Sequence, residues 1–242
     1  MNLTMELIEL LKEPVALKTN TYSPISHGEI HETIMNLSTE NHFNVDNVAV
    51  KAKHPRNCIV TYNLTDMLKE QKEKEIGIKI GFKNSYDKTI SFGFAIGSEV
   101  FICTNGMVSG EYTIKKQHRM NDLNVYVKDL IREHFFKVRE EHSKNLVLAN
   151  TLKGESINVA DAKKLIGGLF MNGNILTNAQ LRKMSDQCYE SKTFKTFADN
   201  NTITCWDLYN HGTEALKTAA NRNYFAKHVE YNNFFKNEFG LN

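Results

Sequence analysis

Side chains alternate between large apolar and small or polar over residues 76–83 and 90–97, and this alternation constrains the fold most. A period of two places every second side chain on one face of a β-sheet. The two runs are separated by Asn84-Ser85-Tyr86-Asp87-Lys88, a turn-type sequence, and Asn105-Gly106 is a strong hairpin signal. We therefore predict an antiparallel meander with strands at 57–64, 76–83, 89–97, 99–104 and 107–115.

Helical periodicity and capping signals surround this meander. Ser26 and Thr177 each begin a capping-box pattern, and Ser156 is a further candidate cap. We predict helices over 3–13, 26–37, 120–150, 159–170, 177–190, from Thr202 or Thr204 onward, and over 222–238. The predicted class is α+β: an antiparallel meander of about four to five strands packed against helices, including one long helix, followed by a helical C-terminal region.

The character of the chain changes near residues 152–156, from sheet plus helix to all helix. We predict a sheet domain over 1–152 and a helical region over 153–242, which is either separate or packed on the first as one unit.

Bulk properties favour an ordinary cytoplasmic protein. The chain has 242 residues and a formal net charge of +2, which is too mild to indicate nucleic acid by itself. Its four cysteines are widely spaced without a Cys-x-x-Cys pair, so a zinc ribbon or redox motif is not favoured. No apolar run approaches the roughly 20 residues of a membrane helix, so we expect no membrane association.

Motifs for catalysis or metal binding are weak. His27 and His31 lie four residues apart, but Gly28 stands where the zinc-protease motif needs Glu, and helix capping by Ser26 and Glu29 explains the segment. There is no Gly-x-Ser-x-Gly and no Walker-type loop, and residues 97–99 fit a turn between strands. We therefore predict no catalytic residue, metal or cofactor, although an enzyme site assembled from distant residues stays open.

Two basic clusters give the best indication of a binding site. The first cluster lies before the first predicted strand and consists of Lys51, Lys53, His54 and Arg56. The second lies between the predicted meander and the long helix and consists of Lys115, Lys116, His118 and Arg119. If they meet in space, they form a groove that can follow a phosphate backbone. Tyr62, Tyr86 and Tyr112 are candidates for base stacking on an exposed sheet face. The alternative is two unrelated solvated patches.

Three segments carry a family resemblance. Residues 80–88 contain an Asn-Ser-x-Asp turn, residues 100–108 a Cys-x-Asn-Gly turn, and residues 206–214 a Trp…Asn…Thr-Glu segment. Together they resemble the phage/plasmid-like protein family of unknown function, which is encoded on mobile elements. The family-motif residues at the turns are Asn84, Asp87, Cys103, Asn105 and Gly106. Their physical interpretation is structural: local turn bonds for Asn84 and Asp87, a tight hairpin at 105–106, and a buried Cys103.

The order of elements is also similar to the core of single-strand annealing recombinases, which form rings around single-stranded DNA. Our leading hypothesis is a non-catalytic phage or plasmid protein that binds single-stranded nucleic acid, as a homo-oligomer, in recombination or annealing. Lys51, Lys53, Arg56, Lys115, Lys116 and Arg119 would neutralise phosphates. The alternative is a module that binds a host or phage protein, with the aromatic helix at 222–238 as its working surface.

Overall fold

A computed structural model describes residues 5–69, 75–100, 105–113 and 123–241. The strands of the main sheet are β1 (Phe43–His54), β2 (Asn57–Asp66), β3 (Ile76–Ser85), β4 (Gly93–Val100) and β5 (Asn105–Thr113). The helices before and just after it are α1 (Met5–Lys12), α2 (His27–Glu40), α3 (Leu123–Phe135) and α4 (Val138–Gly154). The C-terminal region contains β6 (Ser156–Asn158), α5 (Val159–Met171), α6 (Asn178–Glu190), β7 (Thr202–Thr204), α7 (Cys205–Leu216), a 3-10 turn (Asn221–Asn223) and α8 (Tyr224–Glu238).

The five long strands form one antiparallel sheet in sequence order, β1-β2-β3-β4-β5. The predicted α+β class and meander are therefore confirmed, together with the helical C-terminal region. The first strand was missed, because residues 43–54 mix polar and apolar side chains without a clean alternation. The loop predicted at residues 51–56 is accordingly wrong: Lys51 and Lys53 belong to β1, and only Pro55-Arg56 turns the chain into β2.

The strand boundaries after β3 also differ from the prediction. Residues 97–99 do not turn but continue β4, which runs unbroken to Val100. Asn105 and Gly106 are the first residues of β5, paired with Val100 and Glu99, so the hairpin turn predicted at 105–106 is wrong. Residues 101–104, which include Cys103, lie outside the described residues.

Gly97 shows why β4 tolerates a glycine that looked like a turn signal. A Cβ atom at this position would lie 2.0 Å from the carbonyl oxygen of Met107 on β5. The register of β4 and β5 shifts between Ile96 and Gly97, which brings the two backbones unusually close. The glycine therefore serves close backbone packing at a bulge.

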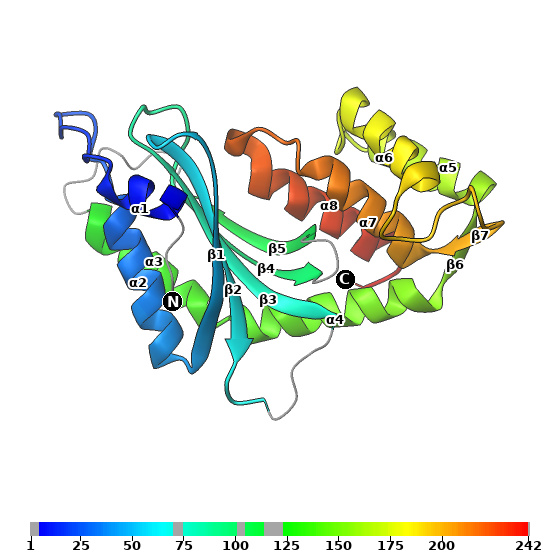
Figure 1. Cartoon of the computed structure of the whole chain (residues 1–242), viewed down its shortest axis with the longest axis horizontal. Helices are drawn as coiled ribbons and strands as arrows, with labels where there is room; N and C mark the ends of the chain where they lie inside the picture. The colour runs from blue at the N-terminus through cyan, green and yellow to red at the C-terminus, as the bar shows by residue number, and fades with distance from the viewer. Residues whose placement is uncertain (1–4, 70–74, 101–104, 114–122, 242) are drawn as a thin grey trace.

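One face of the sheet carries the first hydrophobic core. Alternate strand residues such as Val60, Tyr62, Ile80 and Phe94 are fully buried there and pack against α1, α2 and α3. Figure 1 shows α2 and α3 on this side of the sheet and α7 and α8 on the other. The side chains predicted to share a face of the second strand, Cys58 to Leu64, do so.

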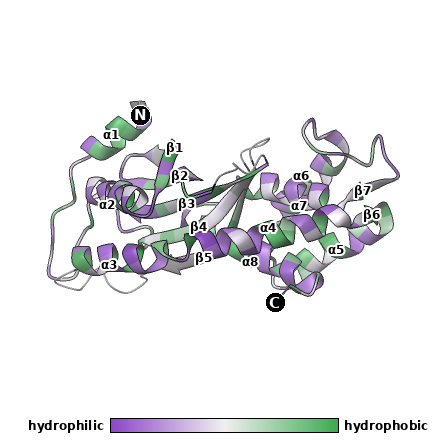
Figure 2. Ribbon diagram, turned by 90° about the horizontal axis from the view of Figure 1, so that it is seen from below, coloured by the Kyte–Doolittle hydropathy of each residue, from purple (hydrophilic) through white to green (hydrophobic). Residues whose placement is uncertain are grey.

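The second core joins the sheet to the helical region. Ile76, Val100 and Met107 pack with buried residues of α4 to α8, so both parts of the chain contribute to it. Helix α4 extends from the sheet into the helical region, and packs against β3, β4, β5 and α7. Figure 2 shows the resulting elongated arrangement, with α1 to α3 at one end and α5 to α7 at the other.

The aromatic residues of α8 belong to the interior. Phe225, Tyr231, Phe234 and Phe235 are all buried, against the sheet and against α7. Packing explains their spacing, so this aromatic face does not form a surface.

Helix boundaries follow the caps. Thr177 and Thr204 form complete capping boxes with Gln180 and Asp207, and Ser26 accepts a hydrogen bond from the Glu29 amide. Two helix predictions need correction. Asn158, rather than Ser156, caps α5, and the single helix predicted over 120–150 is interrupted between α3 and α4.

Within the described part of the chain, no helix combines the length and apolarity that crossing a bilayer requires.

Candidate functional site

The register of the sheet relates the two basic clusters to each other. Lys51 pairs with Ile59, Ile59 with Lys83, Lys83 with Gly93, and Gly93 with Thr113, so one row crosses all five strands. Neighbouring strands lie about 4.8 Å apart, which places the two ends of this row about 19 Å from each other. The β1–β2 turn and the C-terminal end of β5 therefore lie at the same end of the sheet. Lys115, Lys116 and Arg119 follow Thr113 and lie outside the described residues.

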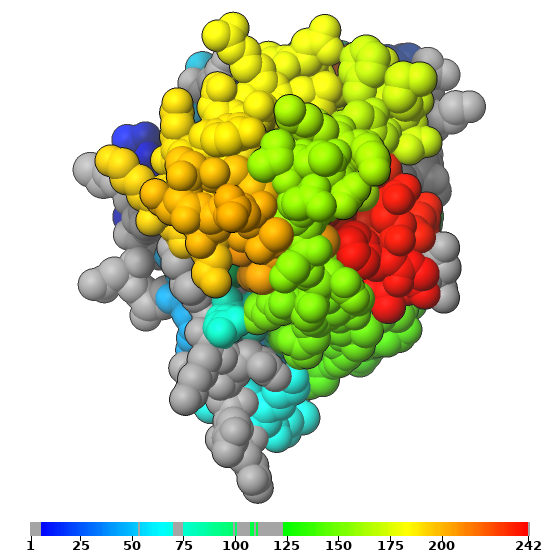
Figure 3. All heavy atoms as spheres, turned by 90° about the vertical axis from the view of Figure 1, so that its right-hand side faces the viewer, coloured from blue at the N-terminus to red at the C-terminus, as the bar shows by residue number. Residues whose placement is uncertain are grey.

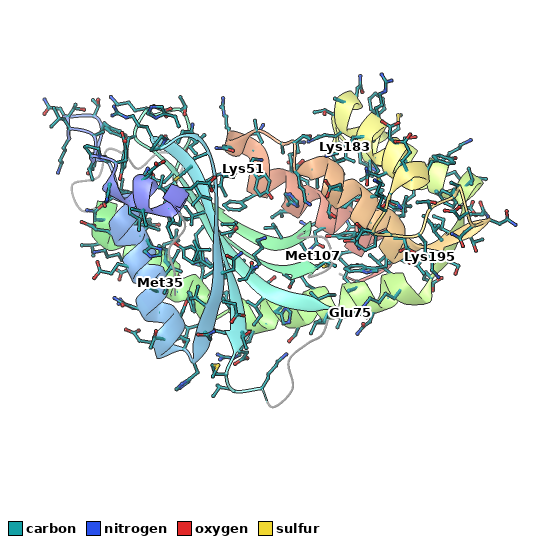
Figure 4. The ribbon with its side chains drawn as sticks, viewed as in Figure 1. Met35, Lys51, Glu75, Met107, Lys183 and Lys195 are labelled. Atoms are coloured by element: carbon teal, nitrogen blue, oxygen red, sulfur yellow. The ribbon has the colours of Figure 1, made fainter. Side chains whose placement is uncertain are left out.

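Lys51 has a structural task at this end. Its Nζ donates to the carbonyl oxygens of Lys217 at 3.0 Å and Ala219 at 2.9 Å, and it lies 4.3 Å from the centre of the Tyr224 ring. Burial lowers the pKa of Lys51. Figure 4 labels this lysine on β1, beside the segment that joins α7 to α8. Lys51 thus braces the C-terminal segment against the sheet.

Lys83 lies in the same cross-sheet row as Lys51, two strands away, and makes a similar contact. Its Nζ donates to the carbonyl oxygen of Arg222 at 3.1 Å and lies 5.9 Å from the Phe225 ring. The sequence offered no sign of this role, because Lys83 alternates with apolar residues as an ordinary exposed strand lysine would. The two lysines bind carbonyls left at the end of α7 and in the following turn.

Arg56 is an exposed member of the first cluster. Its side chain is 44% exposed, and its Nε lies 3.7 Å from a carboxylate oxygen of Glu13. An ion pair this exposed and this long is weak, so the guanidinium can exchange Glu13 for another anion. Lys88, in the turn after β3, adds a cation here, 4.7 Å from the Tyr22 ring. The side chain of Lys53 lies outside the described part of the structure.

Two of the aromatic residues proposed for base stacking, Tyr62 and Tyr86, do not lie on an open face. Tyr62 is completely buried, and its hydroxyl lies 2.9 Å from Nδ1 of His31. Tyr86 is 3% exposed and stacks on the His27 ring. Their proposed role is therefore wrong, because the alternation of β2 turns Tyr62 into the first core. The side chain of Tyr112 lies outside the described residues.

Asn84 of the family motif belongs to a buried polar cluster. Its Nδ2 donates to the carbonyl oxygen of Ile25 at 2.8 Å and lies 3.1 Å from Nδ1 of His27. Cys58 is next to the same ring, with its Sγ 3.8 Å from Nδ1. The prediction of a local turn bond holds for Asp87, which binds the amide and hydroxyl of Thr89, but not for Asn84, which lies within β3.

A cysteine, a histidine and an asparagine in contact could indicate a nucleophile, but the electrostatics oppose it. Burial lowers the pKa of His27 to about 4 and raises the pKa of Cys58 to about 12. The thiolate–imidazolium pair of a reactive cysteine is therefore strongly disfavoured. The cluster anchors the start of α2 to β2 and β3. In the described part of the chain, no three His, Cys, Asp or Glu side chains are grouped to hold a metal ion.

The third family segment, residues 206–214, forms most of α7 and is almost entirely buried. Asn210 donates to the carbonyl oxygen of Trp206 at 2.8 Å, and Nε2 of His211 lies 3.0 Å from the carbonyl oxygen of Lys195. Gly212 lies under Tyr231, where a Cβ atom would be 2.0 Å from the tyrosine oxygen. These residues fix α7 between α8 and the chain that precedes β7.

The fold and these contacts define a class of α+β protein in which an antiparallel meander and a helical region share one core. The chain belongs to the family described as Domain of unknown function (DUF932), whose model matches residues 14–236. No curated protein and no solved structure matches the chain.

Proposed function

We propose that this protein binds single-stranded nucleic acid at the end of the sheet where the β1–β2 turn and the C-terminal end of β5 lie. The cross-sheet row from Lys51 to Thr113 supports the proposal, because it places the β1–β2 turn, which contains Arg56, and the C-terminal end of β5, which precedes the second basic cluster in the sequence, at the same end of the sheet. A backbone with regularly spaced phosphates needs several cations along one edge, and in the described part of the chain Arg56 and Lys88 supply two of them.

The proposal assigns different roles to the cations. Lys51 holds the segment between α7 and α8, so its contribution to binding is indirect. Arg56 and the three basic residues at 115, 116 and 119 are the proposed phosphate ligands. Helix α8 covers the second face of the sheet next to Lys51. The bound single-stranded nucleic acid would therefore pass over the end of the sheet rather than across this face.

The test is fluorescence anisotropy with labelled single- and double-stranded oligonucleotides, at several salt concentrations. Replacement of Lys115, Lys116 and Arg119 by Ala should lower the slope of log K against log salt by about 2, since each single-strand phosphate contact contributes about 0.7. Arg56→Ala should lower the same slope by about 0.7, the contribution of one phosphate contact.

The matched control removes three charges from the other end of the molecule, by replacing Lys163, Lys164 and Arg182 of α5 and α6 with Ala. All three are exposed, so folding should not suffer. Equal slopes for the two triple variants, or no binding at low salt, would refute the proposal.

The resemblance to mobile-element proteins supports a phage or plasmid origin and a role in annealing or recombination. Such a role also includes self-assembly, which light scattering with and without oligonucleotide measures.

A protein partner is the second candidate function. Exposed apolar side chains on α3 and after it favour it, with Val125 at 60% and Phe136 at 67% exposure. Since the aromatic face of α8 is buried, the docking surface would lie at these residues. Phe136→Ser should abolish capture of that partner and leave oligonucleotide binding unchanged.

A further inference from the structure

A polar cavity lies in the helical region, away from the basic end of the sheet. Its volume is about 370 Å³, within the range of about 300–1,000 Å³ that small-molecule sites occupy. It is lined by Gln187, Glu190, Ser191, Lys192, Thr193, Phe194, Asn210 and Glu214. The lining thus comes from the end of α6, the chain after it and α7, which lie together on the face of the molecule in Figure 3. Figure 4 labels Lys183 on α6 and Lys195 just beyond the lining.

The chain that forms one wall is held in place by hydrogen bonds. The amides of Thr193 and Phe194 donate to Oγ of Ser191, at 3.3 and 3.2 Å. The next amide, of Lys195, donates to a carboxylate oxygen of Asp207 on α7 at 3.3 Å. A wall fixed before binding reduces the ordering that a ligand would otherwise have to impose.

Four of the lining side chains have polar groups that the fold does not use. Within the described residues, no hydrogen bond or ion pair engages the side chains of Gln187, Glu190, Lys192 or Thr193. They supply an amide, a carboxylate, an ammonium and a hydroxyl around one space. A ligand that satisfies them carries hydrogen-bond donors and acceptors as well as negative charge.

The remaining lining adds a flat apolar surface, whereas the amide of Asn210 already donates to the carbonyl oxygen of Trp206. Phe194 lines the cavity, and its ring forms a T-shaped pair with the His211 imidazole, with the two ring centres 6.2 Å apart and the planes at 87°. Asn210 is completely buried. An aromatic ring for stacking combined with an amide for edge recognition is the chemistry with which proteins read a nucleobase, and Asn and Gln pair best with adenine.

We propose that this cavity binds an adenine nucleotide. The base stacks on Phe194 and pairs with the Gln187 amide, while Lys192 neutralises the phosphate and Glu190 accepts hydrogen bonds from the ribose hydroxyls. This site does not depend on the nucleic-acid interface at the sheet, and either proposal can fail alone.

The test is isothermal titration calorimetry of the full chain with AMP, and with ribose 5-phosphate as a probe that lacks the base. One AMP should bind per chain, and ribose 5-phosphate should bind at least tenfold more weakly. Gln187→Ala should weaken AMP binding at least tenfold, because a bidentate amide–base pair is lost.

The matched control is Asp186→Ala, an exposed neighbour on α6 that does not line the cavity, and it should leave the affinity unchanged. Circular dichroism shows whether each variant is folded. Absence of AMP binding at millimolar concentration would overturn the proposal. So would unchanged binding in a folded Gln187→Ala variant, or equal affinity for ribose 5-phosphate.

Discussion

Acid should destabilise this protein through His142, a buried histidine of α4 that has to stay neutral. Its Nδ1 lies 2.8 Å from Oγ of Ser98 on β4, and the same hydroxyl oxygen accepts a hydrogen bond from Nδ2 of Asn145 at 3.1 Å. The imidazole is thus held inside the protein beside the polar groups of Ser98 and Asn145, and burial disfavours its charged form. Burial lowers the pKa of His142 to about 4; Lys69 lowers it further, and Asp66 raises it.

The sign and size of the effect follow from linkage. The pKa of the folded state lies below the ordinary value of 6.5, so the unfolded chain binds the proton more tightly. The stabilisation is complete above pH 6.5 and is lost as the pH falls towards 4. Between pH 7 and pH 5 this one group should cost about 2 kcal/mol of the free energy of unfolding.

Urea unfolding, followed by the fluorescence of the single tryptophan, Trp206, measures this loss. His142→Gln retains a polar side chain beside Ser98 but does not titrate. Between pH 7 and pH 5 the free energy of unfolding of this variant should therefore fall by about 2 kcal/mol less than that of the unmodified chain. His54→Gln removes one histidine at an exposed position of β1 and is the matched control. If His142→Gln loses as much stability between these pH values as the unmodified chain does, the explanation is refuted.

Three further substitutions test the packing, each by its urea midpoint at pH 7. Gly212→Ala should cost about 1–3 kcal/mol, because its Cβ would lie 2.0 Å from the oxygen of Tyr231, and an unchanged midpoint would contradict that contact. Arg139→Lys should cost about 1–2 kcal/mol, because Arg139 binds both carboxylate oxygens of Asp66, at 2.7 and 2.9 Å, and lysine cannot reproduce the fork. Lys51→Met keeps an apolar stem but loses two hydrogen bonds to carbonyls, so it should cost about 1–3 kcal/mol, and a cost near zero would show that Lys51 is not a brace.

Local signals in the sequence determined much of the fold. The alternation over residues 76–83 defined β3, because a period of two assigns every second side chain to one face whatever packs on it. The capping residues Ser26 and Thr177 located the starts of α2 and α6, since a cap binds amides of its own first turn. For α7 the sequence left Thr202 and Thr204 open, and the structure selects Thr204.

Features set by distant parts of the chain could not be predicted in this way. A glycine in a turn and Gly97 at a bulge look alike in sequence, because the nearby carbonyl of Met107 belongs to another strand. Asn84 looked like a turn residue because its partners, Ile25 and His27, lie nearly sixty residues earlier. Contacts between residues that are distant in sequence produce no local pattern in the sequence around either residue.

The same division applies to the candidate site. The sequence by itself supplied two basic clusters, since charge is a local property, but left open whether they meet. The register of five strands decided that the β1–β2 turn and the C-terminal end of β5 lie at one end of the sheet, and the packing of the segment between α7 and α8 decided that Lys51 is committed to carbonyls there. Strand pairing and burial are properties of the assembled chain, and they determine which charges remain available to a ligand.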